Sequence, residues 1–252
     1  MTSAQGQRRI AIVTGAGAGV GRAIAQRLAQ GGAAVVVADR DFDAAQAVRG
    51  EIAAAGGAAL ATRTDVTSDA SLREMVSCAL KQYGQIDWLV NNAGMLGPIK
   101  PFWETTDEEI QRVYDLNVRC VFACTRLVAR HMVERKTGAI VTIASVAGKD
   151  GPKGMSIYAS SKAAVIGFTK SWAKDLAPYG VRANCVSPSL VAATGMGDEM
   201  PDWFKTDSVA RIPMGRAADA SEVANVVHFL LTPEAGFVTG ACYDVSGGRA
   251  SY

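Results

Sequence analysis

The chain has 252 residues, of which 49% are hydrophobic and 20% are charged. This composition is ordinary for a folded globular protein and excludes a disordered chain. The 26 basic and 24 acidic residues are spread without long runs of one sign, so the charge pattern gives no indication of a nucleic-acid-binding or membrane-binding surface.

Short apolar stretches alternate with longer helical patterns along the whole chain. Six stretches are apolar on both faces, which is typical of buried strands in a parallel sheet, and a seventh stretch closes the chain. We expect strands at 9–15, 33–40, 58–66, 86–94, 138–145, 181–188 and 240–248. Helices are expected between them at Val20–Gln30, Asp43–Ala55, Ser68–Gln82, Asp107–Glu134, Met155–Leu176 and Ala220–Leu231. This alternation predicts an α/β fold with a doubly wound parallel sheet and helices on both faces.

The segment TGAGAGVG, Thr14–Gly21, joins the first expected strand to the first helix. Gly15, Gly19 and Gly21 would allow a tight turn, close approach of the backbone to a pyrophosphate, and close packing of helix on strand. The start of the helix at Val20 would offer unpaired N–H groups to the anion. Taken alone, the turn is also compatible with a simple strand–helix connection, and the lack of a Gly-Lys-Ser/Thr motif excludes a P-loop.

Acidic residues end the second and third expected strands. A carboxylate at Asp39 can accept hydrogen bonds from both ribose hydroxyls of an adenosine and would repel a 2′-phosphate, which predicts NAD in preference to NADP. The neighbouring guanidinium of Arg40 could tolerate that phosphate. Asp65 and Val66 are placed to cover the adenine ring, and capping of the next helix is an equally open role for Asp65.

Two residues four apart, Tyr158 and Lys162, lie on one face of the helix that follows the fifth strand. A phenol titrates near pH 10, so a general base at neutral pH needs a lowered pKa. A nearby ammonium and the positive nicotinamide of an oxidised cofactor would lower it. Ser145 ends the preceding strand and could hydrogen-bond a substrate oxygen. Taken alone, a Tyr-x-x-x-Lys pair is usually a solvated surface pair.

The least regular region is 189–215. In doubly wound folds ligands bind beyond the carboxyl ends of the strands, so we expect this long segment to be a substrate-binding loop and lid. No repeat, linker or low-complexity segment interrupts the chain, which favours one domain over residues 1–252.

Six motifs occur in a recognisable order: TGAGAGVG, NNAG (Asn91–Gly94), Asn117 within YDLNVRC, Ser145, YASSK, and SPS (Ser187–Ser189). Together they closely resemble the short-chain dehydrogenase/reductase family over essentially the whole chain. The resemblance implies a single-domain Rossmann-type fold with a seven-stranded sheet, a homotetramer, and a nicotinamide cofactor.

The resemblance also implies the roles of four residues. Tyr158 would be the catalytic acid/base, and Lys162 would lower its pKa and bind the nicotinamide ribose. Ser145 would polarise the substrate carbonyl or carbinol, and Asn117 would anchor a water chain that carries the proton from Lys162 to solvent. The implied reaction is hydride transfer between C4 of the nicotinamide and a carbinol carbon, with no metal.

Cofactor contacts at the other strand ends follow from the same resemblance, by which Asn92, Ala93 and Gly94 would lie beside the cofactor, as would Pro188. The family usually has Pro-Gly after the sixth strand, whereas Ser189 follows the proline here. The family's threonine that meets the nicotinamide carboxamide is replaced by Ala193. We therefore assign that contact to the Val191 backbone and Thr194.

The substrate is less constrained by the sequence. Lys149 and Lys153 flank the approach to the site and could attract an anionic substrate such as a sugar-derived hydroxy acid, or they could be solvated loop lysines. Four large side chains could instead wall a pocket for an alicyclic alcohol: Trp103, Met196, Trp203 and Phe204. An NADPH-dependent 3-oxoacyl-thioester reductase shares the fold, but Asp39 argues against NADPH. We expect oxidation to be the preferred direction.

Two other classes of protein are alternatives. An S-adenosylmethionine methyltransferase also has a glycine-rich turn and an acid after the second strand, but it has no reason to combine Ser145, Tyr158 and Lys162. A non-catalytic NAD-binding protein would keep the fold without the chemistry.

The remaining residues bear on cellular location and metals. The five cysteines are scattered without a CxxC pair, which predicts reduced thiols in a cytoplasmic protein. We expect no secretory signal and no membrane span, since no apolar run approaches about 18 residues. His131 and His228 lie far apart in the sequence, which disfavours a histidine-rich metal site.

Overall fold

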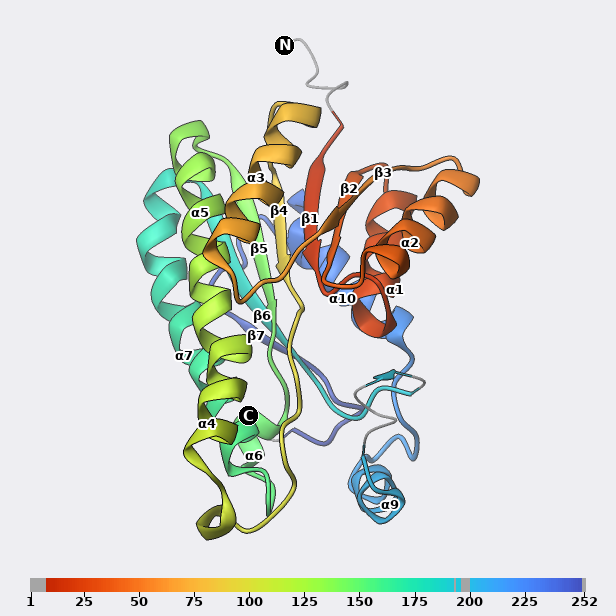
Figure 1. Cartoon of the computed structure of the whole chain (residues 1–252), viewed down its shortest axis with the longest axis vertical. Coiled ribbons are helices and arrows are strands. Elements are labelled where there is room, and N and C mark those ends of the chain that lie inside the picture. Colours follow the sequence, from red (N-terminus) through yellow and green to blue (C-terminus); the bar gives the residue numbers. More distant parts are fainter. Residues whose placement is uncertain (1–7, 193, 196–199, 251–252) are drawn as a thin grey trace.

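A seven-stranded, all-parallel sheet forms the centre of the computed structural model, which describes residues 8–192, 194–195 and 200–250 (Figure 1). Its strands are β1 Ile10–Thr14, β2 Ala34–Asp39, β3 Ala58–Arg63, β4 Trp88–Asn91, β5 Gly138–Ile143, β6 Val181–Pro188 and β7 Cys242–Val245. Their order in the sheet is β3-β2-β1-β4-β5-β6-β7. All seven predicted strands are confirmed. The order reverses direction between β1 and β4, and ligands bind at such a switch point.

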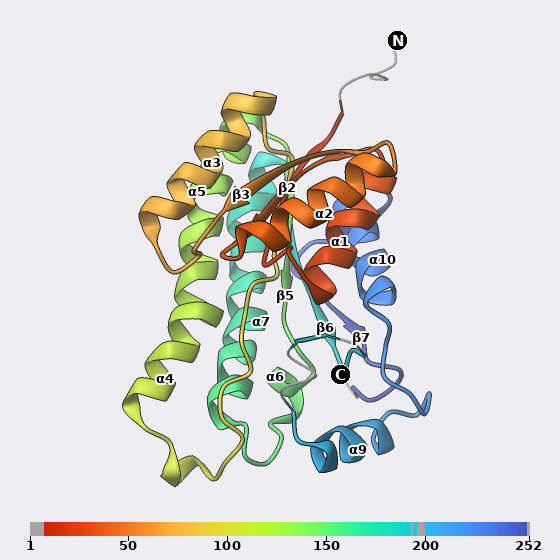
Figure 2. The ribbon, with the colours of Figure 1, turned by 45° about the vertical axis from the view of Figure 1, so that its right-hand side comes forward.

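Helices cover both faces of this sheet, as Figures 1 and 2 show. Helices α1, α2 and α10 pack on one face, and α3, α5 and α7 on the other. Their bounds are α1 Gly19–Gln30, α2 Phe42–Ala54, α3 Asp69–Tyr83, α5 Cys120–Arg135, α7 Ser156–Leu176 and α10 Ala220–Leu231. The shorter elements are α4 Asp107–Tyr114, α6 Ala147–Asp150, α9 Asp202–Ala210, and the 3₁₀ turns Phe102–Glu104, Ala177–Tyr179 and Pro233–Ala235.

The strands explain why both faces read as apolar in the sequence. In β1, Ala11 and Val13 pack under α1 and α10, whereas Ile12 between them packs under α3 and α5. All three side chains are fully buried. Successive strand residues point to opposite faces, so a strand covered on both sides needs apolar residues at every position.

Two expected elements differ from the structure. The predicted helix 107–134 is divided into α4 and α5 by a π-helical turn, η2 Asp115–Arg119. The region 189–215, expected to be irregular, contains α9. Only Phe204 and Ser208 of α9 are buried, which is one residue per turn. A helix that buries so few residues shows little apolar periodicity in its sequence.

Cysteines on α5 serve packing. Cys120 and Cys124 lie one turn apart and are buried in the core between α5 and the sheet. Burial raises the pKa of each thiol to about 12, so both stay protonated at neutral pH. In the part of the chain that the structure describes, no helix combines the length and the apolarity that a membrane crossing requires.

Candidate active site

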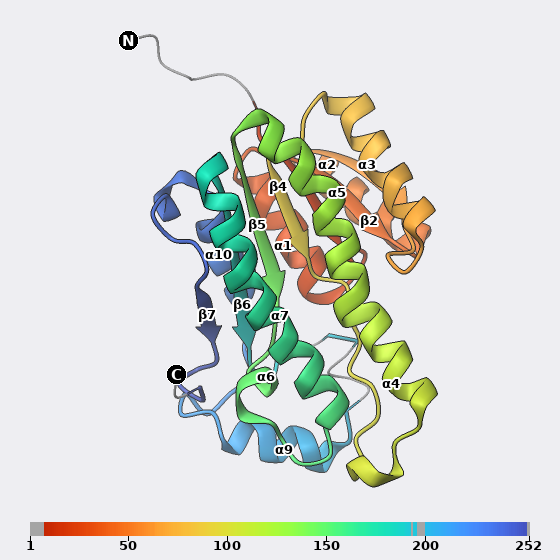
Figure 3. The same ribbon diagram turned by 90° about the vertical axis from the view of Figure 1, so that its left-hand side faces the viewer.

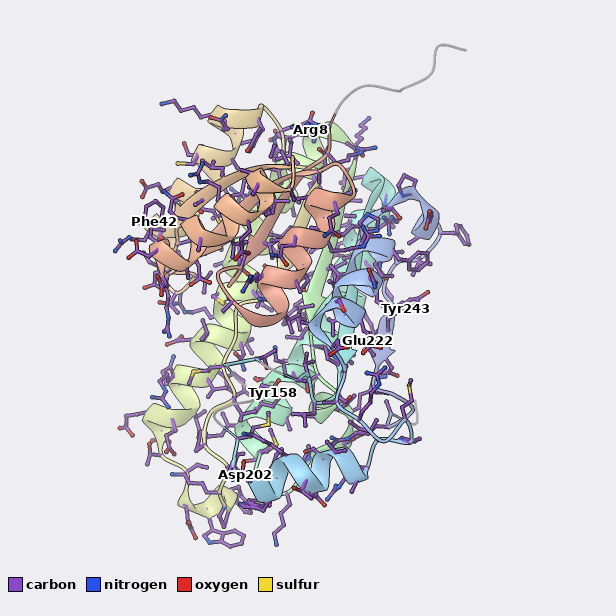
Figure 4. The ribbon with its side chains drawn as sticks, turned by 90° about the vertical axis from the view of Figure 1, so that its right-hand side faces the viewer. Arg8, Phe42, Tyr158, Asp202, Glu222 and Tyr243 are labelled. Carbon is purple, nitrogen blue, oxygen red and sulfur yellow. The ribbon has the colours of Figure 1, made fainter. Side chains whose placement is uncertain are left out.

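A cavity of about 1400 Å³ lies at the carboxyl ends of the central strands. Every cofactor-binding residue predicted from the sequence lines it, and so does Ser145. Figure 4 places Tyr158 in this region, between the helices above it and α9, whose first residue, Asp202, is labelled below. The cavity therefore extends from the glycine-rich turn to α9.

The glycine-rich turn requires glycine at specific positions. Gly15 and Gly19 have φ of 61° and 53°, in the left-handed region. A Cβ on Gly21 would overlap the carbonyl oxygen of Gly15 and would lie 2.5 Å from Nδ2 of Asn92. The Asn92 amide donates hydrogen bonds of 3.0 Å to the carbonyls of both Thr14 and Gly15. The NNAG segment therefore holds the turn in shape from the neighbouring strand.

Helix α1 differs from its neighbours at its N-terminus. Helices α2 and α3 begin with side chains, Asp41 and Ser68, that accept hydrogen bonds from their first turns. No described side chain caps α1, which begins after Ala18. The first residues of α1, Gly19 and Val20, line the cavity. The uncapped N–H groups and the helix dipole suit a pyrophosphate at this position.

The carboxylate of Asp39 is held at the end of β2. It accepts hydrogen bonds from the backbone N–H of Gly17 at 2.8 Å and of Asp41 at 3.0 Å. Each oxygen keeps a further lone pair for another donor, as two ribose hydroxyls require. Arg40, beside it, also lines the cavity.

Asp65 organises its own turn and does not cap α3, because Ser68 is the capping residue. Its Oδ1 accepts hydrogen bonds from the hydroxyl of Thr67 at 2.7 Å and from the Thr67 backbone at 2.9 Å. These bonds lower the pKa of Asp65, so the carboxylate stays ionised at neutral pH. Val66, the next residue, is buried and lines the cavity.

Tyr158 and Lys162 lie one turn apart on α7 and are buried. Tyr158 shares a side-chain hydrogen bond with Ser145 at the end of β5. The Nζ of Lys162 lies 5.8 Å from the centre of the Tyr158 ring and donates a 2.8 Å hydrogen bond to the carbonyl of Ile143. Residues from β5 and α7 thus bring a hydroxyl, a phenol and an ammonium to one wall of the cavity.

The pKa of Tyr158 departs from the sequence-based expectation. Burial raises it above the ordinary value of a phenol, and the hydrogen bond with Ser145 lowers it by a smaller amount. The expected lowering by Lys162 is therefore not reached in the protein alone. Burial also lowers the pKa of Lys162 to about 8, which leaves most of its ammonium charged at pH 7.

Asn117 lies in the π-helical turn and does not line the cavity. Its side chain accepts from the N–H of Met95 and donates to the Met95 carbonyl, both at 2.9 Å, and it donates to Ser161 at 3.1 Å. These bonds tie the segment after β4 to α7. A Cβ on Gly94 would approach Asn117 Oδ1 to 3.1 Å and Lys162 Nζ to 3.5 Å, so Asn117 and Lys162 flank the same glycine.

The two lysines expected to flank the approach to the site are not part of the cavity wall. Neither Lys149 nor Lys153 is among the described residues that line the cavity. Lys149 forms an ion pair with Asp244 of β7 at 3.0 Å. Although burial lowers the pKa of Lys149, the hydrogen bond and the charge of Asp244 outweigh it, and the pKa is raised. Arg249, close to the end of the chain, is a cation that lines the cavity, and no motif indicated it as a site residue.

Of the three wall residues that the structure describes, Trp103, Trp203 and Phe204, only Phe204 lines the cavity. It is buried and packs in the same cluster as Tyr158 and Met155. Trp103 and Trp203 are 73% and 64% exposed and are not among the described lining residues. Met196 and Ala193 lie outside the described residues. Val191 and Thr194 both line the cavity, and their contact with the carboxamide stays a prediction.

Candidate metal ligands are dispersed among the residues that the structure describes. Nowhere in those residues do three or more His, Cys, Asp or Glu side chains gather in a way that could hold a metal ion. The cavity wall carries the Tyr158 phenol, the Lys162 ammonium and the glycine-rich turn.

Comparison with known proteins agrees with this geometry. The short chain dehydrogenase family profile matches residues 9–205. The chain is 38% identical over 244 residues to an NAD(+)-dependent 2-dehydro-3-deoxy-L-rhamnonate dehydrogenase of Sphingomonas sp., covering 97% of this chain and 96% of that protein. It is 40% identical to the 4-formylbenzenesulfonate dehydrogenase of Comamonas testosteroni, with 96% and 98% covered.

A solved structure is similarly close. The 3-ketoacyl-(acyl-carrier-protein) reductase from Brucella melitensis, complexed with NADH, superimposes with a TM-score of 0.91 at 34% identity, covering 97% of this chain and 99% of that one. Similarity of this extent, in sequence and in fold, identifies the chain as a member of the short-chain dehydrogenase/reductase family of nicotinamide-dependent oxidoreductases.

Proposed function

We propose that the protein is an NAD-dependent dehydrogenase that transfers a hydride between the nicotinamide and a secondary alcohol or ketone. The observation that carries this proposal is the group of Ser145, Tyr158 and Lys162 on one wall of the cavity that also contains the glycine-rich turn. The residues present fit a dinucleotide. Gly21 allows the tight turn, because a Cβ there would collide with the turn itself. No described side chain caps the first N–H groups of α1, and the Asp39 carboxylate can accept further hydrogen bonds from a ribose.

In the oxidation direction, Tyr158 Oη takes the hydroxyl proton of the substrate while Ser145 holds the same oxygen by a hydrogen bond. The nicotinamide, when bound, supplies or accepts the hydride at C4 and, in its oxidised form, adds a positive charge beside the phenol. Lys162 stays charged at neutral pH, stabilises the phenolate and holds the ribose. Asn117 fixes α7 against the segment after β4 and anchors the water chain that leads from Lys162 to solvent.

Asp39 is the residue that we expect to set the preference for NAD. Replacing it with asparagine removes the charge and keeps one oxygen, which can accept from Gly17 or from Asp41 but not from both, because these N–H groups bond different carboxylate oxygens. Loss of the charge removes the repulsion of a 2′-phosphate and weakens the hydrogen bonds to the ribose, which are worth roughly 1.5–3 kcal/mol when the acceptor is charged. The ratio of kcat/KM for NAD to that for NADP should fall by about 100-fold, measured by initial rates with both cofactors. A wild-type protein that strongly prefers NADP would contradict this assignment.

For the substrate we propose a small polar or anionic molecule, such as a sugar-derived hydroxy acid. The two relatives are named for a rhamnonate and a benzenesulfonate, which are both anions. Arg249 gives the cavity a positive group at its substrate end. An alicyclic alcohol is a weaker candidate, because Trp103 and Trp203 are exposed and are not among the described residues that line the cavity.

A 3-oxoacyl-thioester reductase stays open as a second candidate. We expected Asp39 to argue against it through the cofactor, but the Brucella reductase was crystallised with NADH. A carboxylate at Asp39 therefore does not separate the two functions, and only the substrate can do so.

A substrate screen tests the proposed function. The protein is incubated with NAD or NADP and a panel of hydroxy acids, alicyclic alcohols and 3-hydroxyacyl thioesters, and NADH or NADPH is followed at 340 nm. We expect the signal with NAD and the hydroxy acids. Confirmed NAD binding without any signal would favour a non-catalytic NAD-binding protein.

We further propose a homotetramer that pairs through α5 and α7, which lie side by side on one face (Figure 3). Three aromatic rings support this pairing: Phe122 of α5, which is 45% exposed, makes edge-to-face contacts with Phe168 and Trp172 of α7 at centroid distances of 4.7 and 4.8 Å. Exposed apolar clusters of this kind mark protein–protein contacts.

The Phe122→Glu variant tests the pairing. A carboxylate at the centre of the contact would lose its hydration there, so the assembly should dissociate to smaller species. Light scattering after gel filtration gives the mass, and unchanged mass would contradict the assignment of this face.

Other expectations from the sequence stay predictions. They are one domain over residues 1–252 with 189–215 as the lid, a cytoplasmic location, and the absence of nucleic-acid and membrane partners.

A further inference from the structure

We propose that Arg249 binds an oxyanion of the substrate, a carboxylate or sulfonate, while the reacting carbon lies at Ser145 and Tyr158. This inference rests on the proposed function, because it names the substrate class of the same site. It places the specificity for anions on the end of the chain and not on Lys149 or Lys153.

The backbone around Arg249 is fixed. After β7 the chain reverses at Gly247 and Gly248, which have φ of 61° and 90°. The N–H of Arg249 then donates to the carbonyl of Ser246 at 3.3 Å, and Met214 donates to the carbonyl of Gly247 at 3.1 Å. The reversal brings this end of the chain beside α6, as Figures 1 and 3 show.

The side chain of Arg249 is held in one orientation. It is only 9% exposed, and its Nε donates to Oδ2 of Asp150, the last residue of α6, at 3.1 Å. Among the described residues, no acceptor pairs with its Nη1 or Nη2. A guanidinium fixed through Nε presents these two nitrogens in a rigid fork that matches an oxyanion. Among the described residues no buried side-chain nitrogen or oxygen lacks a partner, so these two nitrogens are accessible, and Arg249 lines the cavity, where they can donate to an oxyanion.

The arrangement of charges leaves a positive wall facing the substrate. Two consecutive residues of α6, Lys149 and Asp150, pair with Asp244 and Arg249 and join α6 to the end of the chain. Of these four described groups, only the guanidinium of Arg249 lines the cavity. Each ion pair has no net charge, but the member that faces the cavity is the cation, Arg249.

Acidic groups on the far wall reinforce this direction. Asp107 and Glu108, in the first turn of α4, also line the cavity, together with Arg112 one turn later. Figure 3 shows α4 and the chain end on opposite sides, with α7 between them. An anionic substrate is thus repelled from the start of α4 and attracted to Arg249. Asp39, Arg40 and Asp65 lie at the ends of β2 and β3, where the adenosine is expected.

A binding experiment that needs no turnover tests Arg249. Two matched pairs of probes have the same shape with and without a charge: benzoate with benzamide, and benzenesulfonate with benzenesulfonamide. Calorimetry gives their dissociation constants for the protein with and without NADH. We expect at least one anion to bind about 10- to 100-fold tighter than its neutral partner, the range for hydrogen bonds to a charged group. The two pairs distinguish a carboxylate from a sulfonate.

Three variants assign the effect. Arg249→Gln should abolish the preference for the anion and leave the binding of the amides unchanged. Arg249→Lys, which keeps the charge without the fork, should retain part of it. The control is Arg211→Gln, which removes a positive charge from an exposed ion pair with Asp207 outside the cavity lining, and it should bind as the wild type does. Thermal melting confirms that each variant is folded.

The outcomes separate this inference from the proposed function. Equal binding of anion and amide by the wild type, or equal loss of both in Arg249→Gln, would mean that Arg249 only anchors the chain end to α6. If the preference depends on Arg249 but no alcohol is oxidised with NAD, the inference stands and the proposed function falls. With a turned-over acid, Arg249→Gln should raise KM more than it lowers kcat, because the anion contact is made equally in the ground and transition states.

Discussion

Replacing Tyr158 with phenylalanine should lower kcat by about 10²–10⁴-fold, the usual contribution of a positioned acid or base. The ring is buried among Leu96, Met155 and Phe204, and a phenylalanine ring keeps that packing. Only the hydroxyl and its hydrogen bond with Ser145 are lost. The affinity for NADH and the melting temperature should therefore change little, which calorimetry and thermal melting would measure beside the steady-state rates.

A second tyrosine provides a matched control. Tyr114 on α4 donates a 2.9 Å hydrogen bond to Ser160 of α7 and is not among the described residues that line the cavity. Tyr114→Phe removes the same atom beside the same helix, and we expect wild-type rates. If Tyr158→Phe oxidised alcohols as fast as Tyr114→Phe, the phenol would have no role in proton transfer.

The strands and most helices could be predicted because their signals are local. Each strand is buried on both faces, so its residues are apolar without interruption, and β1 shows this in three successive residues, Ala11, Ile12 and Val13. The π-helical turn at Asp115–Arg119 could not be predicted from the same kind of pattern. It coincides with the hydrogen bonds of Asn117 to Met95 and Ser161, which are distant in sequence and exist only in the folded chain.

The two halves of the candidate site differ in the same way. The phosphate cradle and Asp39 follow directly from strands β1 and β2, so their spacing in the sequence indicates their place in the fold. The substrate end depends on pairing across the chain: Lys149 turns to Asp244, 95 residues away, and Asp150 holds Arg249, 99 residues away. Lys149 and Asp150 are adjacent in the sequence and opposite in charge, and the sequence does not indicate which distant partner each one holds or which side chain faces the cavity.

The sequence predicts a lowered pKa for Tyr158 with Lys162 and the oxidised cofactor acting together, whereas in the protein alone the pKa is raised. A lysine four residues away suggests a lowered pKa, because an ammonium favours the phenolate. In the fold both groups are buried, and burial disfavours the charged form of each. The burial of Tyr158 and Lys162 in the fold decides the direction of both pKa shifts, and a sequence motif does not indicate how deeply its residues are buried.

Gly21→Ala should destabilise the fold and abolish NADH binding together. The added Cβ would overlap the carbonyl oxygen of Gly15 and lie 2.5 Å from Nδ2 of Asn92. Neither group can move without breaking the hydrogen bonds of Asn92 to the carbonyls of Thr14 and Gly15. Overpacking of this kind costs about 1–3 kcal/mol, and each lost hydrogen bond adds about 1 kcal/mol. Urea unfolding should therefore show a loss of about 3 kcal/mol.

Gly50→Ala separates the effect of the turn from the effect of the methyl group. Gly50 lies inside α2 with no atom within 4 Å of a Cβ built on it, so the substitution should stabilise the protein by about 0.5–1 kcal/mol, since alanine favours a helix. Its NADH affinity should equal that of the wild type. If Gly21→Ala instead kept both stability and NADH affinity, the turn would accommodate a Cβ that its geometry excludes, and the anion-binding site would lie elsewhere. Loss of stability with full NADH affinity would likewise remove the turn from the binding site, because a distorted turn would then be no obstacle to the pyrophosphate.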